Sequence, residues 1–155
     1  MAEVDAAVIE FLKTHRLGVL ATGRRDGSPQ QALIAYRFDG RDFMISTRAP
    51  SAKAKNVPKQ PRVSLTVSDG PRVVVVYGRA SLVREPEEVL RYYLTRLVSP
   101  RPSAGPSAGS GGASGQGQTE PVDQEALRRR LGKEERVVLV ITPEKYLPSR
   151  FESRG

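Results

Sequence analysis

Short apolar segments that alternate with polar residues, separated by tight-turn signals, dominate the chain. The clearest alternation runs over residues 31–38, where Ala32, Ile34, Tyr36 and Phe38 share one face of an extended strand. Asp-Gly pairs, which favour hairpin turns, occur at positions 26–27, 39–40 and 69–70. The pattern predicts six strands, at residues 17–22, 31–38, 42–47, 62–68, 72–83 and 136–141.

Three further segments carry helical signals. In the first, Val4, Val8, Phe11 and Leu12 recur at the spacing of one helix face. The second begins with a proline and two glutamates and carries arginine later, an order that suits the helix dipole. The predicted helices span residues 3–14, 86–98 and 123–131.

The longest predicted strand, residues 72–83, contains four consecutive valines. A strand that is apolar on both faces is typical of one covered on both sides, here by a helix or by a second subunit. Gly78 interrupts this strand and predicts a bulge or a barrel corner. Six strands with short turns and helices packed outside predict a mainly β fold, a small antiparallel barrel that leaves no open sheet edge.

Length and composition favour a single domain over residues 1–155. Residues 99–119 are rich in Gly, Ser, Pro and Ala and lack large apolar side chains, so we expect a flexible insertion there. From Pro143 onward we expect a polar tail. The sequence shows no apolar leader segment and no apolar run near the ~20 residues that span a bilayer, so we expect a cytoplasmic protein without a membrane partner.

The chain has no cysteine and one histidine, His15, at the expected end of the first helix. The helix dipole explains a histidine there more simply than catalysis does, and this composition predicts no metal site. The formal net charge of +8 favours an anionic partner: a phosphorylated small molecule, nucleic acid or an acidic lipid surface. A nucleic-acid-binding barrel is disfavoured, because aromatic residues are 6% of the chain and none interleaves with the densest cations.

The cations concentrate between the third and fourth predicted strands. From Arg48 to Arg62 the chain carries two arginines, three lysines and no carboxylate. Thr47 and Ser51 place hydroxyls at the mouth of this basic turn, where a short helix is expected to begin. Lysines, hydroxyls and free backbone N–H groups in that position suit a phosphate. A solvated connector with ordinary N-capping by Ser51 explains the same residues.

Three motifs stand in a characteristic order: Asp-Gly-Ser-Pro at 26–29, Thr-x-x-x-Ser-x-Lys at 47–53, and Asn-Val-x-x-x-Pro-Arg-Val-Ser-Leu at 56–65. Over about residues 5–98 the chain resembles the split β-barrel superfamily of pyridoxamine-phosphate-oxidase-like flavin and deazaflavin proteins. The resemblance implies a split antiparallel barrel of about six strands. It also implies a homodimer with the cofactor site at its interface, where the four-valine strand would be buried by the partner subunit.

The resemblance also bears on the cofactor. FMN-using members offer an arginine and, five residues on, a lysine from the second strand, where this chain has Gln31 and Tyr36. The basic turn resembles instead the branch that binds coenzyme F420, a deazaflavin with a phosphate and an acidic polyglutamate tail. The implied cofactor-binding residues are Thr47, Ser51, Ala52 and Lys53 for the phosphate, Lys55 and Asn56 for the polar edge or tail, and Gln30 and Gln31 for the ring system.

The implied function is that of an F420H2-dependent reductase, which transfers a hydride from reduced deazaflavin to an electron-poor small molecule. No residue is assigned as a general acid, since Tyr36 and Tyr77 are more simply explained as packing residues. The alternatives are an FMN-dependent oxidoreductase, a haem-handling relative, a cofactor carrier without turnover, and the nucleic-acid-binding barrel. The sequence does not indicate the substrate.

Overall fold

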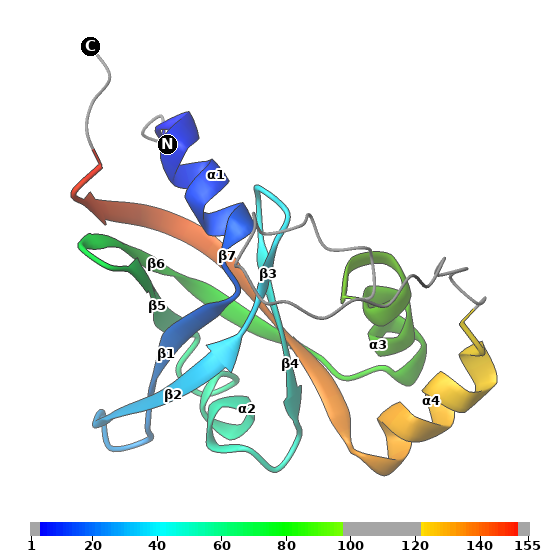
Figure 1. Ribbon diagram of the computed structural model, residues 1–155. Coiled ribbons are helices and arrows are strands. Elements are labelled where there is room, and N and C mark those ends of the chain that lie inside the picture. The colour runs from blue at the N-terminus through cyan, green and yellow to red at the C-terminus, as the bar shows by residue number, and fades with distance from the viewer. Residues whose placement is uncertain (1–3, 98–121, 152–155) are drawn as a thin grey trace, which may run out of the picture.

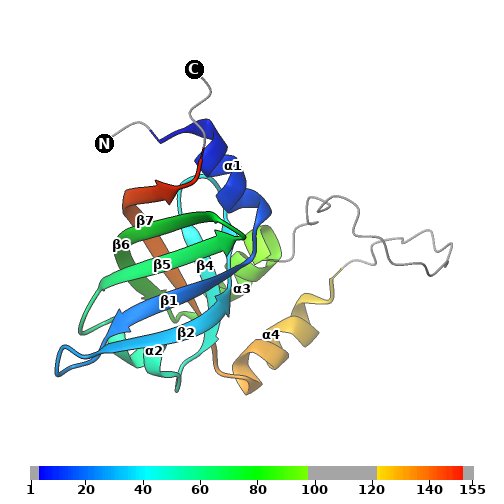
Figure 2. The same cartoon turned by 60° about the vertical axis from the view of Figure 1, so that its left-hand side comes forward.

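The computed structural model describes residues 4–97 and 122–151, which form one seven-stranded sheet rolled into a split barrel (Figures 1 and 2). Neighbouring strands follow the order β2-β1-β5-β6-β7-β4-β3, and every pairing is antiparallel. The strands are β1 (Leu17–Gly23), β2 (Pro29–Ala35), β3 (Arg37–Phe38), β4 (Phe43–Arg48), β5 (Arg62–Asp69), β6 (Arg72–Val83) and β7 (Arg136–Ser149).

The second predicted strand is divided at Tyr36, which gives seven strands instead of six. Before the division, Ala35 pairs with Leu17 of β1; after it, Arg37 pairs with β4. Between them, the backbone N–H of Tyr36 donates to the carbonyl of Arg16 at 2.8 Å. The two edge strands of the sheet are therefore consecutive parts of one segment, and the sheet closes at residue 36. The predicted split barrel is confirmed.

Strand β7 continues to Ser149, so the polar tail predicted from Pro143 is wrong. The physical reason is the length of β6, whose residues Val73 to Val83 pair with β7 from Ser149 back to Val138. Pro143 is tolerated because the register shifts beside it, at Gly78, which confirms the predicted bulge. A Cβ atom on Gly78 would lie 2.4 Å from the carbonyl oxygen of Thr142, so the two strands approach too closely there for any side chain.

Helices α1 (Ala6–Thr14) and α2 (Ala52–Asn56) lie at opposite ends of the barrel (Figure 1). Both ends are thereby closed with apolar side chains, Leu12 from α1 and Val57 from the residue after α2. Inside the barrel, the alternation predicted for residues 31–38 is confirmed. Its inward members join the main core, which includes Ile34, Tyr36, Phe38, Phe43, Leu65, Val74, Val76, Leu139 and Ile141.

Three helical segments pack outside the barrel on β4 and the first part of β7: α3 (Pro86–Tyr92), the π-helix η1 (Tyr93–Leu97) and α4 (Gln124–Lys133). The helix predicted at 86–98 thus changes its hydrogen-bonding pattern after Tyr92. A second apolar cluster joins these helices to the sheet, through Met44, Val89, Leu90, Tyr93, Leu127, Leu131, Val138 and Val140. Its strand residues explain the continuous apolar run of β7, which is buried on both faces.

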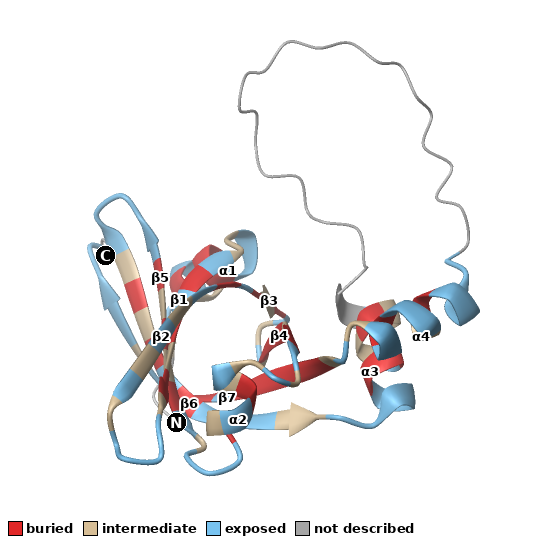
Figure 3. Ribbon diagram, turned by 90° about the horizontal axis from the view of Figure 1, so that it is seen from below, coloured by how far each residue is buried: buried red, intermediate tan, exposed pale blue. Residues whose placement is uncertain are grey.

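The remaining outer face of the sheet is open. Figure 2 shows β7, β6, β5, β1 and β2 side by side, with none of the described helices in front of them, and Figure 3 shows exposed residues along these strands. Of the four valines in β6, two are fully buried and two point outward and stay partly exposed. A helix therefore does not cover their outer face within the described residues.

The insertion predicted at residues 99–119 lies outside the described residues. Within the described residues, no helix combines the length and apolarity needed to cross a membrane. The same part of the chain contains no cluster of three or more metal-ligating side chains.

Candidate functional site

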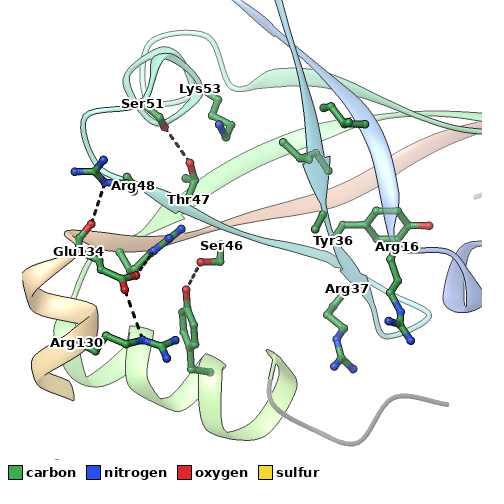
Figure 4. Close-up of a pocket in the computed structure, with 15 residues that line it drawn as sticks. Arg16, Tyr36, Arg37, Ser46, Thr47, Arg48, Ser51, Lys53, Arg130 and Glu134 are labelled. Carbon is green, nitrogen blue, oxygen red and sulfur yellow. Dashed lines mark hydrogen bonds and ion pairs between the residues drawn. The ribbon is translucent and has the colours of Figure 1, made fainter. Parts of the chain in front are cut away.

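A groove of about 610 Å³ lies between two walls, one at the β2–β3 division and the other formed by β4, α4 and the start of β7 (Figure 4). Its volume falls within the usual range of small-molecule sites, about 300–1,000 Å³. Among the described residues, one carboxylate lines it, that of Glu134. Six cationic side chains line it as well: Arg16, Arg37, Arg48, Lys53, Arg130 and Arg136. The groove therefore favours an anionic ligand.

Three of the predicted phosphate-binding residues meet in this groove. Thr47 is buried near the end of β4, and its Oγ1 lies 3.0 Å from Oγ of Ser51. Ser51 caps α2 as predicted, because its Oγ accepts the backbone N–H of Ala54 at 3.3 Å. Lys53 is half-buried and extends from α2 toward the space between the walls (Figure 4). Two hydroxyls and an ammonium group thus converge at one end of the groove.

Four of the other predicted residues lie outside the groove lining, on the hairpin side of α2 or in solvent. Asn56 Nδ2 donates to Oγ1 of Thr22 at 3.1 Å, and that hydroxyl donates to Oε1 of Gln30 at 3.2 Å. Gln30 in turn donates to the carbonyl of Gln31 at 3.0 Å. Lys55 is exposed. The buried hydroxyl of Thr22, which the sequence did not single out, joins three of the predicted residues into one network.

Ala52, the remaining predicted residue, is exposed at the first position of α2 and does not line the groove with its side chain. Its predicted part in binding the phosphate would therefore fall to its backbone N–H group, at the start of the helix. That contribution, like the ring and tail contacts assigned to the hairpin side, stays a prediction.

The arginines of the α4 wall surround Glu134. Arg136 Nε donates to Oε2 of Glu134 at 2.8 Å, and Arg130 Nε lies 3.7 Å from Oε1. Arg48 Nε donates to the backbone carbonyl of Glu134 at 3.3 Å. The hydrogen bond from Arg136 is the main cause that lowers the pKa of Glu134 below its usual range. The carboxylate is therefore ionised at neutral pH.

The tyrosines near the groove are engaged in packing contacts. Tyr36 is 3% exposed, and its hydroxyl donates to the carbonyl of Leu12 at 2.8 Å. Burial raises the pKa of Tyr36, so it is not poised to release a proton to the groove. Tyr93 belongs to the outer apolar cluster and shares a hydrogen bond with Ser46 at the groove's lining. Tyr77 lies away from the groove, on the open outer face of the sheet, and is 46% exposed, so the packing role predicted for it is wrong.

Sequence reasoning missed most of the groove's cations. Arg16 precedes β1, Arg37 begins β3, and Arg130 lies in α4, so these residues are far apart along the chain. The net charge of +8 is the one signal in the sequence that pointed to them, and it gives no position.

The model of the pyridoxamine 5'-phosphate oxidase family matches residues 4–148 of the chain. The chain belongs to this family. A solved structure supports the same fold: a conserved hypothetical protein from Mycobacterium tuberculosis superposes with a TM-score of 0.64 and 24% identity, covering 100% of this chain and 94% of that one.

Two curated relatives extend the family assignment. The F420H(2)-dependent biliverdin reductase of Mycobacterium tuberculosis is 32% identical over 103 residues, which are 61% of this chain and 73% of the relative. The pyridoxine/pyridoxamine 5'-phosphate oxidase of Dichelobacter nodosus is 37% identical over 81 residues, which are 50% of this chain and 38% of the relative. The chain therefore spans well under half of the second relative. The predicted superfamily is confirmed, and its F420-dependent branch is supported.

Proposed function

We propose that this protein is a reductase that binds coenzyme F420 in the cationic groove and reduces an electron-poor small molecule. The observation that carries the proposal is the convergence of Lys53, Ser51 and Thr47 at one end of a groove whose other walls supply arginines. A ligand with a phosphate and an acidic tail could bind Lys53 through the phosphate and the arginines through the tail. The relative named as an F420H(2)-dependent reductase supports the same cofactor.

The groove's donors fit such a cofactor. Lys53 and the hydroxyls of Thr47 and Ser51 would hold the phosphate, and Arg48 with Arg130 would meet the acidic tail. Bound there, reduced deazaflavin would supply the hydride. Because these cations are partly exposed, their hold on the ligand would weaken with added salt.

The remaining predicted contacts belong to the part of the ligand that reaches past α2. Gln30 and Gln31 would bond its ring system from the hairpin side, and Asn56 with the exposed Lys55 would bind its polar edge. We assign no proton donor. Tyr36 is not a proton donor to the ligand, because its hydroxyl donates to the backbone carbonyl of Leu12.

An FMN-dependent oxidoreductase is the second candidate, favoured by the Dichelobacter nodosus relative. Two positions of this chain count against it. Gln31 is exposed and outside the groove lining, and the Tyr36 hydroxyl is turned into the core, so neither offers the cation that an FMN phosphate would require there. The choice between the two cofactors rests on this difference.

We also propose that the protein is a homodimer formed through the open face of the sheet. Strand registers place one outward row across five strands, formed by Leu33, Val19, Thr66, Val75 and Leu147. Leu33 is 72% exposed and Val19 is 38% exposed. Neighbouring apolar side chains exposed on one sheet face are typical of an interaction surface. Leu33 and Ala35 also line the groove, so a second copy on this face would complete the groove's wall.

The test of cofactor identity is a titration of the protein with oxidised F420 and, separately, with FMN, followed by cofactor fluorescence at low salt. Lys53→Ala is expected to weaken F420 binding roughly 10- to 100-fold, the usual loss of a charge-assisted hydrogen bond. Lys55→Ala should weaken it less. Lys133→Ala, an exposed lysine in α4 outside the groove lining, is the charge-matched control.

Each outcome of that titration has a distinct meaning. F420 binding that depends on Lys53 supports the proposal. Binding of FMN without a response to F420 would overturn the cofactor assignment and leave the family intact. Binding of neither would overturn the reductase proposal.

A further inference from the structure

The carboxylate of Glu134 occupies the centre of the groove's α4 wall. Glu134 is the C-cap residue of α4, and its side chain contacts Arg136 and Arg130 while its carbonyl accepts Arg48. Figure 4 shows Arg48 and Arg130 on either side of it. All three arginines and the carboxylate line the groove. A ligand bound against this wall therefore meets Glu134 as well as the arginines.

The strand register explains why a carboxylate is needed at this position. Arg48 and Arg136 are directly opposite each other in the β4–β7 ladder. Like charges in that relation repel, so a carboxylate beside them offsets the repulsion when no ligand is present. Glu134 directly follows α4, two residues before Arg136, and among the described residues its carboxylate is the one that contacts Arg136.

The ion pairs of this wall are exchangeable. The side chains of Glu134 and Arg136 are 38% and 31% exposed, and that of Arg130 is 62% exposed. Pairs this open to water contribute little to stability, so replacing one anion by another costs little. Each of the two arginines makes a single contact with the Glu134 carboxylate, and a guanidinium group binds the carboxylates or phosphates of a ligand equally well or in a two-pronged geometry.

We propose that Glu134 is an internal counter-ion, which an anionic group of the bound ligand displaces from Arg130 and Arg136. Glu134 then sets both the affinity and the charge selectivity of the groove. A singly charged ligand only exchanges one anion for another at this wall, whereas a multiply charged ligand gains contacts beyond those it replaces. The ligand class is thus a polyanion. The identity of that polyanion as F420 rests on the proposed function, but the counter-ion role does not.

The decisive variant is Glu134→Gln, which keeps the size of the side chain and removes its charge. In titrations of the full chain, it is expected to bind F420 and the simpler probe pyrophosphate roughly three- to tenfold more tightly, the gain from removing one like charge near the ligand. Glu135→Gln is the matched control. It removes the same charge one residue away, but Glu135 lines a separate pocket outside the groove, so affinity should stay within twofold.

A second variant separates the counter-ion role from a purely positioning one. If Glu134 holds the arginines in place for the ligand, Glu134→Ala weakens binding and Glu134→Gln stays near wild type or weakens it. If it is a counter-ion, both variants bind polyanions more tightly, and the binding of each depends more steeply on salt. Weaker binding by both variants overturns the proposal.

The test also separates this proposal from the cofactor assignment. Unchanged F420 affinity in Glu134→Gln, with F420 bound normally by the wild type, overturns the counter-ion role and leaves the cofactor assignment standing. Tighter pyrophosphate binding by the variant, in a protein that binds neither F420 nor FMN, supports the counter-ion role and removes the cofactor assignment.

Discussion

His15 contacts Asp69 across one end of the barrel, with Nε2 of the imidazole 3.0 Å from Oδ2 of the carboxylate. On its other side, Nδ1 lies 2.7 Å from the carbonyl of Phe11. Both neighbours are acceptors, so both contacts are hydrogen bonds only when each ring nitrogen carries a hydrogen. The pair ties the end of α1 to the β5–β6 turn, which adds a tertiary role to a residue that the sequence explained by the helix dipole alone.

This contact predicts a loss of stability in acid. The hydrogen bond from His15, helped by the charges of His15 and Arg72, lowers the pKa of Asp69 from its ordinary value of 3.8. A depressed carboxyl pKa stabilises the folded state above that ordinary value, and the contribution disappears as the pH falls through the lowered one. Asp69→Asn should therefore lower the melting temperature near pH 6, and the melting temperatures of the variant and the wild type should converge as the pH falls well below 3.8. A gap that persists in acid would contradict the assignment.

Tyr36→Phe is expected to destabilise the barrel without affecting ligand binding. The change leaves the buried carbonyl of Leu12 without its donor, which costs about 1–3 kcal/mol in the free energy of unfolding. Urea denaturation measures this cost. Because the lost hydroxyl points away from the groove, affinity for F420 should stay unchanged. Tyr77→Phe, on the open sheet face, is the control and should stay within about 0.5 kcal/mol of wild type.

Two glycines should respond to alanine in opposite directions. At Gly78 the added Cβ meets the Thr142 carbonyl at 2.4 Å, so the β6–β7 pairing must shift, at a cost of about 1–3 kcal/mol. At Gly132, in the last turn of α4, nothing lies within 4 Å, and alanine should stabilise by about 0.5–1 kcal/mol through its better helix propensity. Equal effects at the two positions in urea denaturation would contradict this view of the bulge.

A charge on the open sheet face should prevent dimer formation. Leu33→Glu places a carboxylate in the outward row of β2, where a second copy would have to bury it. Analytical ultracentrifugation should then show a monomer where the wild type shows a dimer. Val122→Glu is the control, because Val122 is also exposed and apolar but precedes α4 rather than lying on the sheet. A wild-type protein that is monomeric in the same measurement would contradict the proposed dimer.

Much of the local structure could be predicted from the sequence, because it depends on residues a few positions apart. The three Asp-Gly turns formed, with glycine φ angles of 85°, 93° and 57°. Ser51 caps α2, Gly78 marks a bulge, and residues 31–38 alternate between core and solvent as expected. The motif from Thr47 to Lys53 likewise predicted the three residues that converge in the groove.

Other features depend on partners that are distant along the chain. The pattern around Tyr36 reads as one continuous strand, but closure of the sheet divides it, because each half pairs with a different neighbour. The polar sequence after Pro143 predicts a tail, but this segment pairs with the long strand β6 and becomes part of the sheet. Arg16 and Arg130 come to line the same groove although more than a hundred positions lie between them. Propensity and periodicity describe residues that are a few positions apart, whereas non-local strand pairing forms the groove. The positive charge of the groove could therefore be expected from the composition, but the residues that form its walls could not be predicted.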